Sequence, residues 1–135
     1  MKKNINAMKI LIIDDAEPVF SILKLWIEKW GHEAQIAQTG KEALEIVKNN
    51  FFDLILLDIF LPDIIAYDLI PDLKNQWSGM EIITMTGHSS REVEQKVRSH
   101  GILYYMVKPI DFAELESIIQ HMSKKLEESK KRMKI

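Results

Sequence analysis

Five short apolar runs, each as long as a β-strand, alternate along the chain with stretches whose apolar residues recur at helical spacing. This alternation constrains the fold more than any other feature of the sequence. Apolar strands joined by helix-length connections favour a parallel sheet that is covered by helices on both faces. We therefore expect a three-layer α/β domain with strands at residues 8–13, 34–37, 52–57, 80–85 and 103–107.

The expected order of the strands follows from the handedness of the helical connections between them. Right-handed crossovers favour a five-stranded parallel sheet of flavodoxin-like order 2-1-3-4-5, with five alternating helices. The first helix is expected near residues 18–30, where Gly31 marks its end. Its predicted inward face consists of Val19, Leu23, Trp26 and Trp30.

Three later helices begin at recognisable capping residues. Thr39 with Glu42 and Ser89 with Glu92 have the spacing of a capping box. Asp111 is a good N-cap for the last helix.

The third helix is less regular. Pro71 falls within residues 66–76, where it removes an internal hydrogen bond and clashes with the preceding turn, at a cost of about 3 kcal/mol. We expect a kinked, shortened or late-starting helix there.

Length and composition indicate one globular domain. The chain has 135 residues, of which 47% are hydrophobic and 28% charged, and this fits a single core. We expect an N-terminal extension at residues 1–7, the domain at residues 8–122 and a charged helical tail at residues 123–135.

Several function classes are disfavoured. The apolar runs are far shorter than the roughly 20 residues of a membrane span. The basic start is not followed by an apolar region of signal-peptide length, and the chain has no cysteine, so a cytoplasmic location is the default expectation. A net charge of −2 and a pI near 6.1 argue against a broad nucleic-acid-binding surface, which would carry a basic excess.

Polar residues stand where four of the predicted strands end: Asp14, Asp15, Asp58, Thr86 and Lys108. Parallel strands end at one edge of a sheet, and ligands bind in the crevice there, where the strand order reverses. We therefore expect three carboxylates, one hydroxyl and one ammonium to converge.

Three clustered carboxylates require a compensating cation, since two like charges about 4 Å apart repel by roughly 4 kcal/mol at an effective dielectric of 20. Mg²⁺ prefers hard oxygen ligands, whereas Zn²⁺ fits poorly because no Cys or His lies among these strand ends. With part of the charge neutralised, one carboxylate can attack a phosphoryl donor. Asp58 is the candidate nucleophile because it ends the central strand.

The same positions resemble those of response-regulator receiver domains. The matching features are Asp14-Asp15, Asp58 with Pro62 four residues on, Thr86-Gly87 and Lys108-Pro109. The resemblance covers about residues 8–122 and implies a two-component switch in which Asp58 is the phosphoacceptor. It also implies a Mg²⁺ ion held by Asp15 and Asp58, by Asp14 directly or through water, and by the backbone carbonyl of Phe60.

Further roles are implied by the resemblance. Lys108 would pair with the phosphoryl group, Thr86 would move to hydrogen-bond it, and Tyr105 would be the aromatic residue that turns inward with the threonine. A plain half-buried strand aromatic is the alternative reading of Tyr105. The peptide bond between Lys108 and Pro109 would be cis. Phe60 and His88 occupy positions that influence how fast water reaches the phosphoryl group.

The sequence also departs from the family pattern. Ile65-Ala66 stands where an Asp-Gly pair is typical, which leaves the shape of that loop and of the third helix open. We read the four histidines His32, His88, His100 and His121 as surface residues, with His88 alone near the site.

The expected partners are a sensor histidine kinase or a phosphotransfer protein as phosphohistidine donor. Output would pass to an effector protein, or to a second copy in a homodimer, through the face formed by the fourth and fifth helices and the fifth strand. The chain could also be a fragment that continues into an output domain.

Three other functions use a similar fold or a similar strand-end aspartate. A flavin mononucleotide site is disfavoured because Asp14 and Asp15 would repel its phosphate where a helix N-terminus must bind it. A haloacid-dehalogenase-type phosphatase would place a second aspartate at the position of Phe60. The third is a receiver-like protein-binding module that acts without phosphorylation, and the unusual Ile65-Ala66 pair keeps it open.

Overall fold

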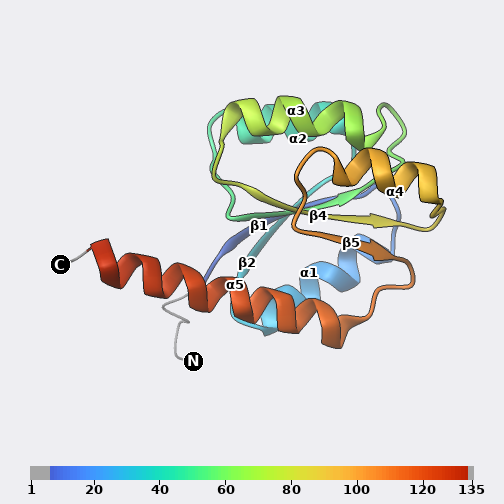
Figure 1. Ribbon diagram of the computed structural model, residues 1–135. Coiled ribbons are helices and arrows are strands. Elements are labelled where there is room, and N and C mark those ends of the chain that lie inside the picture. The colour runs from blue at the N-terminus through green and yellow to red at the C-terminus, as the bar shows by residue number, and fades with distance from the viewer. Residues whose placement is uncertain (1–6, 134–135) are drawn as a thin grey trace.

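The computed structural model describes residues 7–133 and contains a parallel sheet between two layers of helices (Figure 1). Within these residues the strands are β1 (Lys9–Ile13), β2 (Glu33–Ala37), β3 (Leu54–Asp58), β4 (Glu81–Thr86) and β5 (Tyr104–Val107). The helices are α1 (Val19–Lys29), α2 (Gly40–Val47), α3 (Ala66–Gln76), α4 (Arg91–Arg98) and α5 (Phe112–Met133). The strand order is β2-β1-β3-β4-β5, which confirms the predicted topology.

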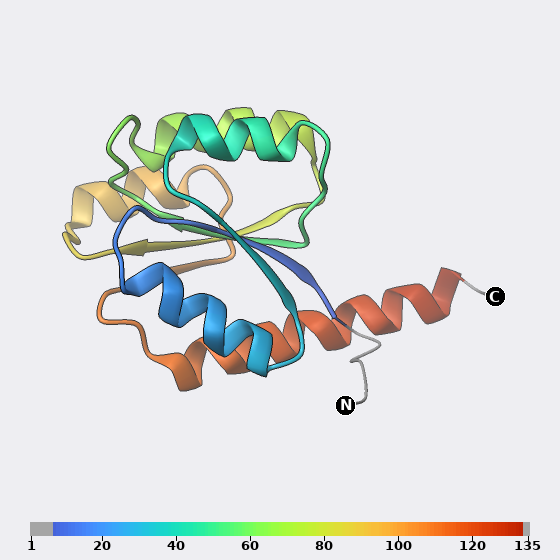
Figure 2. The ribbon, with the colours of Figure 1, turned by 180° about the vertical axis from the view of Figure 1, so that it is seen from behind.

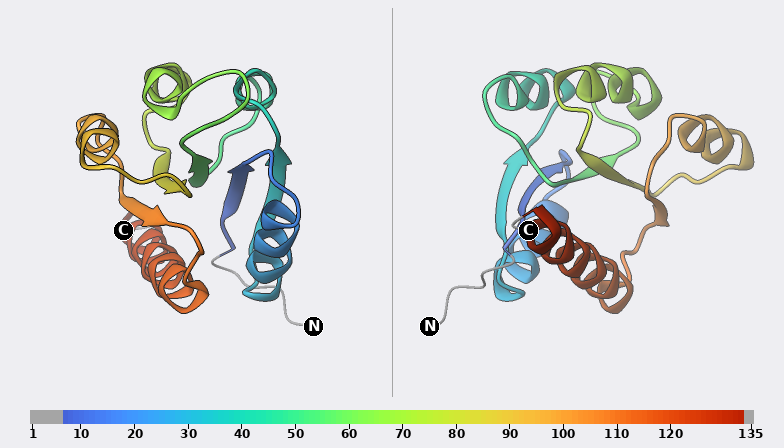
Figure 3. Two further views of the ribbon diagram at one scale, coloured as in Figure 1. Left: turned by 90° about the vertical axis from the view of Figure 1, so that its right-hand side faces the viewer. Right: turned by 60° about the vertical axis from the view of Figure 1, so that its left-hand side comes forward.

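Alternating side chains along the strands divide the core into two halves. Leu11 and Ile13 of β1 point into the half covered by α2, α3 and α4. Ile10 and Ile12 point into the half covered by α1 and α5. Figure 3 shows the sheet between these two helix layers. The inner strands β1, β3 and β4 are therefore buried on both faces over most of their length, whereas the edge strand β2 exposes Glu33 and Gln35.

The predicted capping residues act at three helix starts, with one shift in position. Thr39 Oγ1 accepts a hydrogen bond of 3.0 Å from the backbone N–H of Glu42. Asp111 caps α5 in the same way. At α4 the cap is Ser90 rather than Ser89. Ser89 instead forms a hydrogen bond with the hydroxyl of Tyr105 in β5, and Ser90 caps the helix.

The face of α1 that contacts the sheet agrees with the predicted one only in part, because Val19, Leu23 and Trp30 pack against the core but Trp26 does not. The buried residues of the helix are Phe20, Leu23 and Ile27. Trp26 is 40% exposed and packs beside Trp30 and Phe112, with ring centroids 6.1 and 6.0 Å away. Figure 2 shows why, because α1 lies next to α5 as well as on the sheet. Trp26 therefore covers the boundary between the two helices, whereas Trp30 is half-buried and packs against the core.

The expectation of a shortened or late-starting third helix was wrong, and the alternative of a kink at Pro71 stays a prediction. α3 begins at Ala66 and runs for 11 residues with Pro71 inside it. Proline removes one bond from the first turns, but four apolar side chains of the helix are buried. Those residues are Ala66, Leu69, Ile70 and Leu73. Their burial outweighs the cost of the proline.

The last helix continues well past the sheet. α5 has 22 residues and ends at Met133, so the predicted tail is helical through that residue (Figure 1). Residues 134–135 and 1–6 lie outside the described residues, and the domain boundaries stay predictions. None of the helices within residues 7–133 is long and apolar enough to cross a membrane.

The register of the strands aligns the residues that follow them. Ile13 of β1 is opposite Leu57 of β3, so Asp14 and Asp58 come next at the same level. Thr86 of β4 is opposite Val107 of β5, directly before Lys108. The carboxyl edge of the sheet therefore collects the polar residues that the sequence placed at the strand ends.

Candidate functional site

Three carboxylates meet at the carboxyl edge of the sheet. One oxygen from each of Asp14, Asp15 and Asp58 lies within 4.8 Å of the others. Asp14 is fully buried, Asp58 is 7% exposed, and Asp15 faces solvent. The backbone after β1 fixes Asp14, since its Oδ1 accepts a hydrogen bond of 2.9 Å from the N–H of Ala16. The cluster is thus partly buried yet open on the side of Asp15.

Lys108 places an ammonium group beside two of these carboxylates. Its Nζ lies 2.9 Å from Asp14 Oδ2 and 3.5 Å from Asp58 Oδ2. The backbone N–H of Lys108 donates to the carbonyl of Thr86 at 2.7 Å, which keeps β5 in register with β4 up to the site. The peptide bond from Lys108 to Pro109 is cis.

These neighbours change the proton affinity of Asp58. Burial, and after it the charge of Asp14, raise the pKa of Asp58 to about 6 against the opposing effects of Lys108 and of the hydrogen bond from Phe60. Burial alone would lower the pKa of Lys108, but its hydrogen bond to Asp14 and the charges of both carboxylates outweigh burial and raise it. One ammonium therefore does not neutralise the cluster.

The donor set fits a hard divalent cation. Carboxylate oxygens are the ligands that Mg²⁺ prefers, and it keeps several waters that the open side at Asp15 can admit. Neither Cys nor His belongs to the cluster, so a zinc site would lack its usual ligands.

Three more of the predicted residues surround Asp58. The backbone N–H of Phe60 donates to Asp58 Oδ1 at 3.4 Å, and the Phe60 side chain is 37% exposed. Its ring contacts the ring of His88 edge-on, with centroids 6.3 Å apart. The hydroxyl of Thr86 is buried and accepts a hydrogen bond of 3.0 Å from the N–H of His88.

Tyr105 lies farther from the carboxylates. It is 7% exposed, and its hydroxyl lies 2.8 Å from the hydroxyl of Ser89. The guanidinium of Arg98 lies 5.7 Å from the ring centroid. Ser89 is a contact that the sequence did not reveal, because its partner is 16 residues away and on another element. The hydroxyl pair joins β5 to the loop that carries His88.

The sequence model of the response regulator receiver domain family matches residues 10–120, which include every one of these residues. The chain belongs to this family. Such a receiver domain is a signalling phosphoacceptor module of two-component systems.

Relatives and solved structures agree with this placement. The transcriptional regulatory protein ZraR of Escherichia coli (strain K12) is 30% identical over 111 residues, which are 82% of this chain and 25% of ZraR. CusR of the same strain is 32% identical over 108 residues, which are 80% of this chain and 48% of CusR. A CheY-like receiver domain protein from Methanospirillum hungatei JF-1 has a TM-score of 0.84 at 32% identity, covering 91% of this chain and 98% of that protein.

The chain therefore spans a quarter to a half of the length of these two curated relatives, but nearly all of the Methanospirillum hungatei receiver. What this chain shares with ZraR and CusR is the receiver part.

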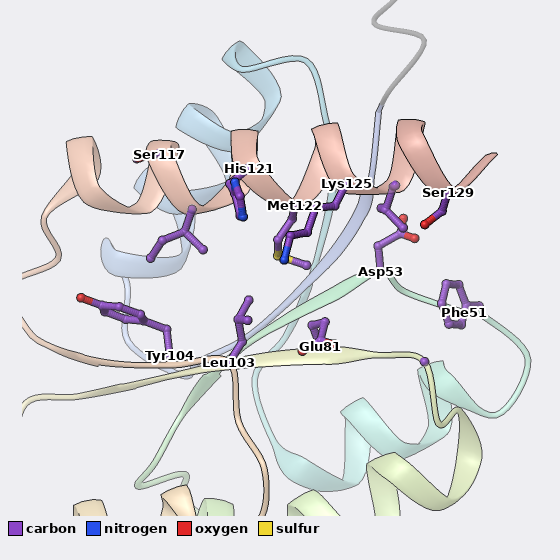
Figure 4. Close-up of a pocket in the computed structure, with 13 residues that line it drawn as sticks. Phe51, Asp53, Glu81, Leu103, Tyr104, Ser117, His121, Met122, Lys125 and Ser129 are labelled. Carbon is purple, nitrogen blue, oxygen red and sulfur yellow. The ribbon is translucent and has the colours of Figure 1, made fainter. Parts of the chain in front are cut away.

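The opposite edge of the receiver's sheet has a different character. A cleft of about 590 Å³ lies there between α5 and the first residues of β4 and β5 (Figure 4). Leu103, Tyr104 and Met122 give it apolar walls, and Asp53 and Glu81 stand at its sheet side. The cleft is thus remote from the acidic cluster.

His32 lies at this amino edge, and the expectation that it is a surface residue was wrong. It is 6% exposed, and its Nδ1 accepts a hydrogen bond of 3.0 Å from the N–H of Met8. Burial lowers the pKa of His32, although the charge of Asp53 opposes this. Asp53 in turn accepts a hydrogen bond of 2.9 Å from the N–H of Lys9.

Proposed function

We propose that this receiver domain accepts a phosphoryl group on Asp58 from a phosphohistidine of a sensor kinase or phosphotransfer protein. The observation that carries the proposal is the convergence of Asp14, Asp15, Asp58 and the Lys108 ammonium at one sheet edge. Membership of the receiver family supports the same chemistry.

Each of these residues would have its own role in phosphoryl transfer. A carboxylate oxygen of Asp58 bonds to phosphorus as the bond from phosphorus to the donor histidine nitrogen breaks, and that nitrogen keeps the electron pair. Catalysis of such a transfer is mostly positioning and charge stabilisation. Lys108 would move from Asp58 to a phosphoryl oxygen, and the Thr86 hydroxyl would donate to another.

Asp14, Asp15 and Asp58, with the backbone carbonyl of Phe60, would hold Mg²⁺. When bound, the ion would supply positive charge to the phosphoryl oxygens. The side chains of Phe60 and His88 flank Asp58 and would limit the access of water to the acyl phosphate.

Output would use the face formed by α4, β5 and α5, in a cytoplasmic protein that binds neither membrane nor nucleic acid through this domain. Tyr104 and Val107 of β5 are exposed on that side, and Tyr105 links β5 to the loop after Thr86. A shift of Thr86 toward a phosphoryl group would therefore reach a surface that an effector protein or a second copy can contact.

The experiment is intact-mass spectrometry after incubation with acetyl phosphate or phosphoramidate, with and without Mg²⁺. We expect one phosphoryl adduct that requires Mg²⁺ and disappears in Asp58→Asn. Asp72→Asn, an exposed aspartate of α3, is the matched control and should label like the natural chain. An adduct that persists in Asp58→Asn would contradict the assignment. The absence of any adduct or beryllofluoride complex would favour a phosphorylation-independent binding module.

A further inference from the structure

The loop between β3 and α3, residues 59–65, follows Asp58 directly and is folded back on itself. The N–H of Leu61 donates to the carbonyl of Ile64 at 3.2 Å, and the N–H of Ala66 donates to that of Ile59 at 2.8 Å. The loop is therefore a compact turn, and its end at Ala66 is bonded to Ile59, the residue that follows Asp58.

The tip of the loop is bonded to α2. Asp63 Oδ1 accepts a hydrogen bond of 2.9 Å from the N–H of Gly40, and Oδ2 accepts one of 3.0 Å from the N–H of Lys41. N–H groups in the first turn of a helix have no partner within the helix and carry its positive end. The Gly40 N–H in particular holds the pKa of Asp63 below its usual range. The carboxylate is therefore charged at neutral pH.

Packing brings the loop close enough for these bonds. A Cβ atom added at Gly40 would overlap the Cγ2 of Ile64. Glycine at this position lets Ile64 lie directly on the start of α2, beside Asp63. The contact between loop and helix thus has an apolar part and a charged part.

The other end of the loop lies at the acidic site. Phe60 donates its N–H to Asp58 and places its ring against His88. Residues 59–65 therefore bridge α2 on one side and the loop after β4 on the other, with Asp58 between them.

The adjoining helix offers no comparable anchor. The N-cap of α3 is Ile65, whose apolar side chain cannot accept a hydrogen bond from the first turn. Asp63 reaches away from α3 to α2 and is the charged side chain that holds the loop.

We propose that Asp63 is a positioning residue for the acidic site. Its two bonds to α2 hold residues 59–65 so that the backbone of Phe60 stays beside Asp58, and they thereby set the affinity of the site for Mg²⁺. This inference rests on the proposed function, because it concerns the same ion and the same phosphoryl acceptor.

The test compares Mg²⁺ binding by Asp63→Ala, Asp63→Asn and the natural chain, using isothermal titration calorimetry. We expect a Kd about ten-fold weaker for Asp63→Ala, the lower end of what supporting residues of metal sites contribute. Asparagine keeps one acceptor oxygen, so Asp63→Asn should bind between the two. With acetyl phosphate, saturating Mg²⁺ should restore most of the labelling rate of Asp63→Ala.

Thr39→Ala is the matched control. It removes the hydrogen bond that the N–H of Glu42 donates to Thr39 Oγ1 in the same first turn of α2, and it leaves both bonds of Asp63 in place. Both alanine variants should lower the unfolding midpoint in urea to a similar extent. Only Asp63→Ala should weaken Mg²⁺ binding, whereas Thr39→Ala should stay within about two-fold of the natural chain.

A second readout needs no ion. The backbone amides of Gly40 and Lys41 should exchange hydrogen faster in Asp63→Ala than in the natural chain. Equal Mg²⁺ affinity in Asp63→Ala and the natural chain, or equal weakening in Asp63→Ala and Thr39→Ala, would overturn the proposal. If the natural chain neither binds Mg²⁺ nor labels, the proposed function fails first, so the two failures are distinguishable.

Discussion

The two edges of the receiver's sheet contain similar polar residues in different surroundings. At the amino edge, His32 and Asp53 each accept a hydrogen bond from a backbone N–H of the first strand region. At the carboxyl edge, Asp14, Asp15 and Asp58 face one another, and one lysine lies among them. Polar groups at the amino edge satisfy the backbone, whereas the carboxylates at the carboxyl edge repel each other, and a bound cation would relieve that repulsion. The first edge therefore stabilises the fold, and the second lowers its stability.

The largest change in the free energy of unfolding is expected when the ammonium of Lys108 is removed from the carboxyl edge. Lys108→Met leaves the fully buried Asp14 without its ammonium partner, and breaking one side of such a pair costs about 3 kcal/mol of unfolding free energy. Urea denaturation in the absence of divalent cations measures this, with the exposed tail residue Lys124→Met as control. A loss below about 1 kcal/mol would mean that Asp14 finds another partner.

Removing the charge of Asp58 should instead raise the free energy of unfolding. The folded chain holds the proton of Asp58 more tightly than the unfolded chain, with a pKa of about 6 against 3.8. Protonation therefore stabilises the fold fully below pH of about 4, and this stabilisation is lost as pH rises through about 6. At pH 8 without metal, Asp58→Asn should be more stable than the natural chain by about 1–2 kcal/mol, since solvent at the open site reduces the full effect.

Urea denaturation at pH 4 and pH 8 measures the difference, which should be smaller at the lower pH. Asp72→Asn should change little at either pH. A less stable Asp58→Asn at pH 8 would show that Lys108 already compensates the acidic cluster.

At the amino edge, the stability that depends on His32 should fall as pH falls, and the change should be smaller than at the carboxyl edge. Because burial lowers the pKa of His32, the unfolded chain takes up the proton first, and stability is lost as pH falls below about 6.5. A protonated imidazole cannot accept the N–H of Met8, so the loss is about 1 kcal/mol. His32→Gln should lack this loss between pH 7.5 and pH 5, which urea denaturation measures. His121→Gln, which is exposed, should retain it. Equal pH profiles for both variants would contradict the role of His32.

Much of the fold could be predicted from the sequence because the spacing of apolar residues and the order of the strands and helices are local properties. The five apolar runs predicted the strands, and the strand ends predicted the cluster of Asp14, Asp58 and Lys108. Trp26 was wrongly placed on the inward face of α1 because α5 contacts the same helix, and no local pattern records that neighbour.

His32 and Asp63 were missed as structural partners for a similar reason. Their bonds go to Met8 and Gly40, which are 24 and 23 residues away. Such pairs form only when distant elements pack, so the residue types alone gave no signal. The start of α3 at Ala66 likewise depends on burial against the sheet, which outweighs the local effect of Pro71.

The length of α5 has a mechanical consequence. The helix begins four residues after Lys108, and Leu126 still packs against the core, seven residues before Met133. These seven residues span about 10 Å at 1.5 Å per residue. A tilt of about 15° about Leu126 would carry Met133 through about 3 Å, by the geometry of a rigid helix. A rearrangement too small to disturb the core would thus be enlarged at the end of α5, where a neighbouring molecule can contact it.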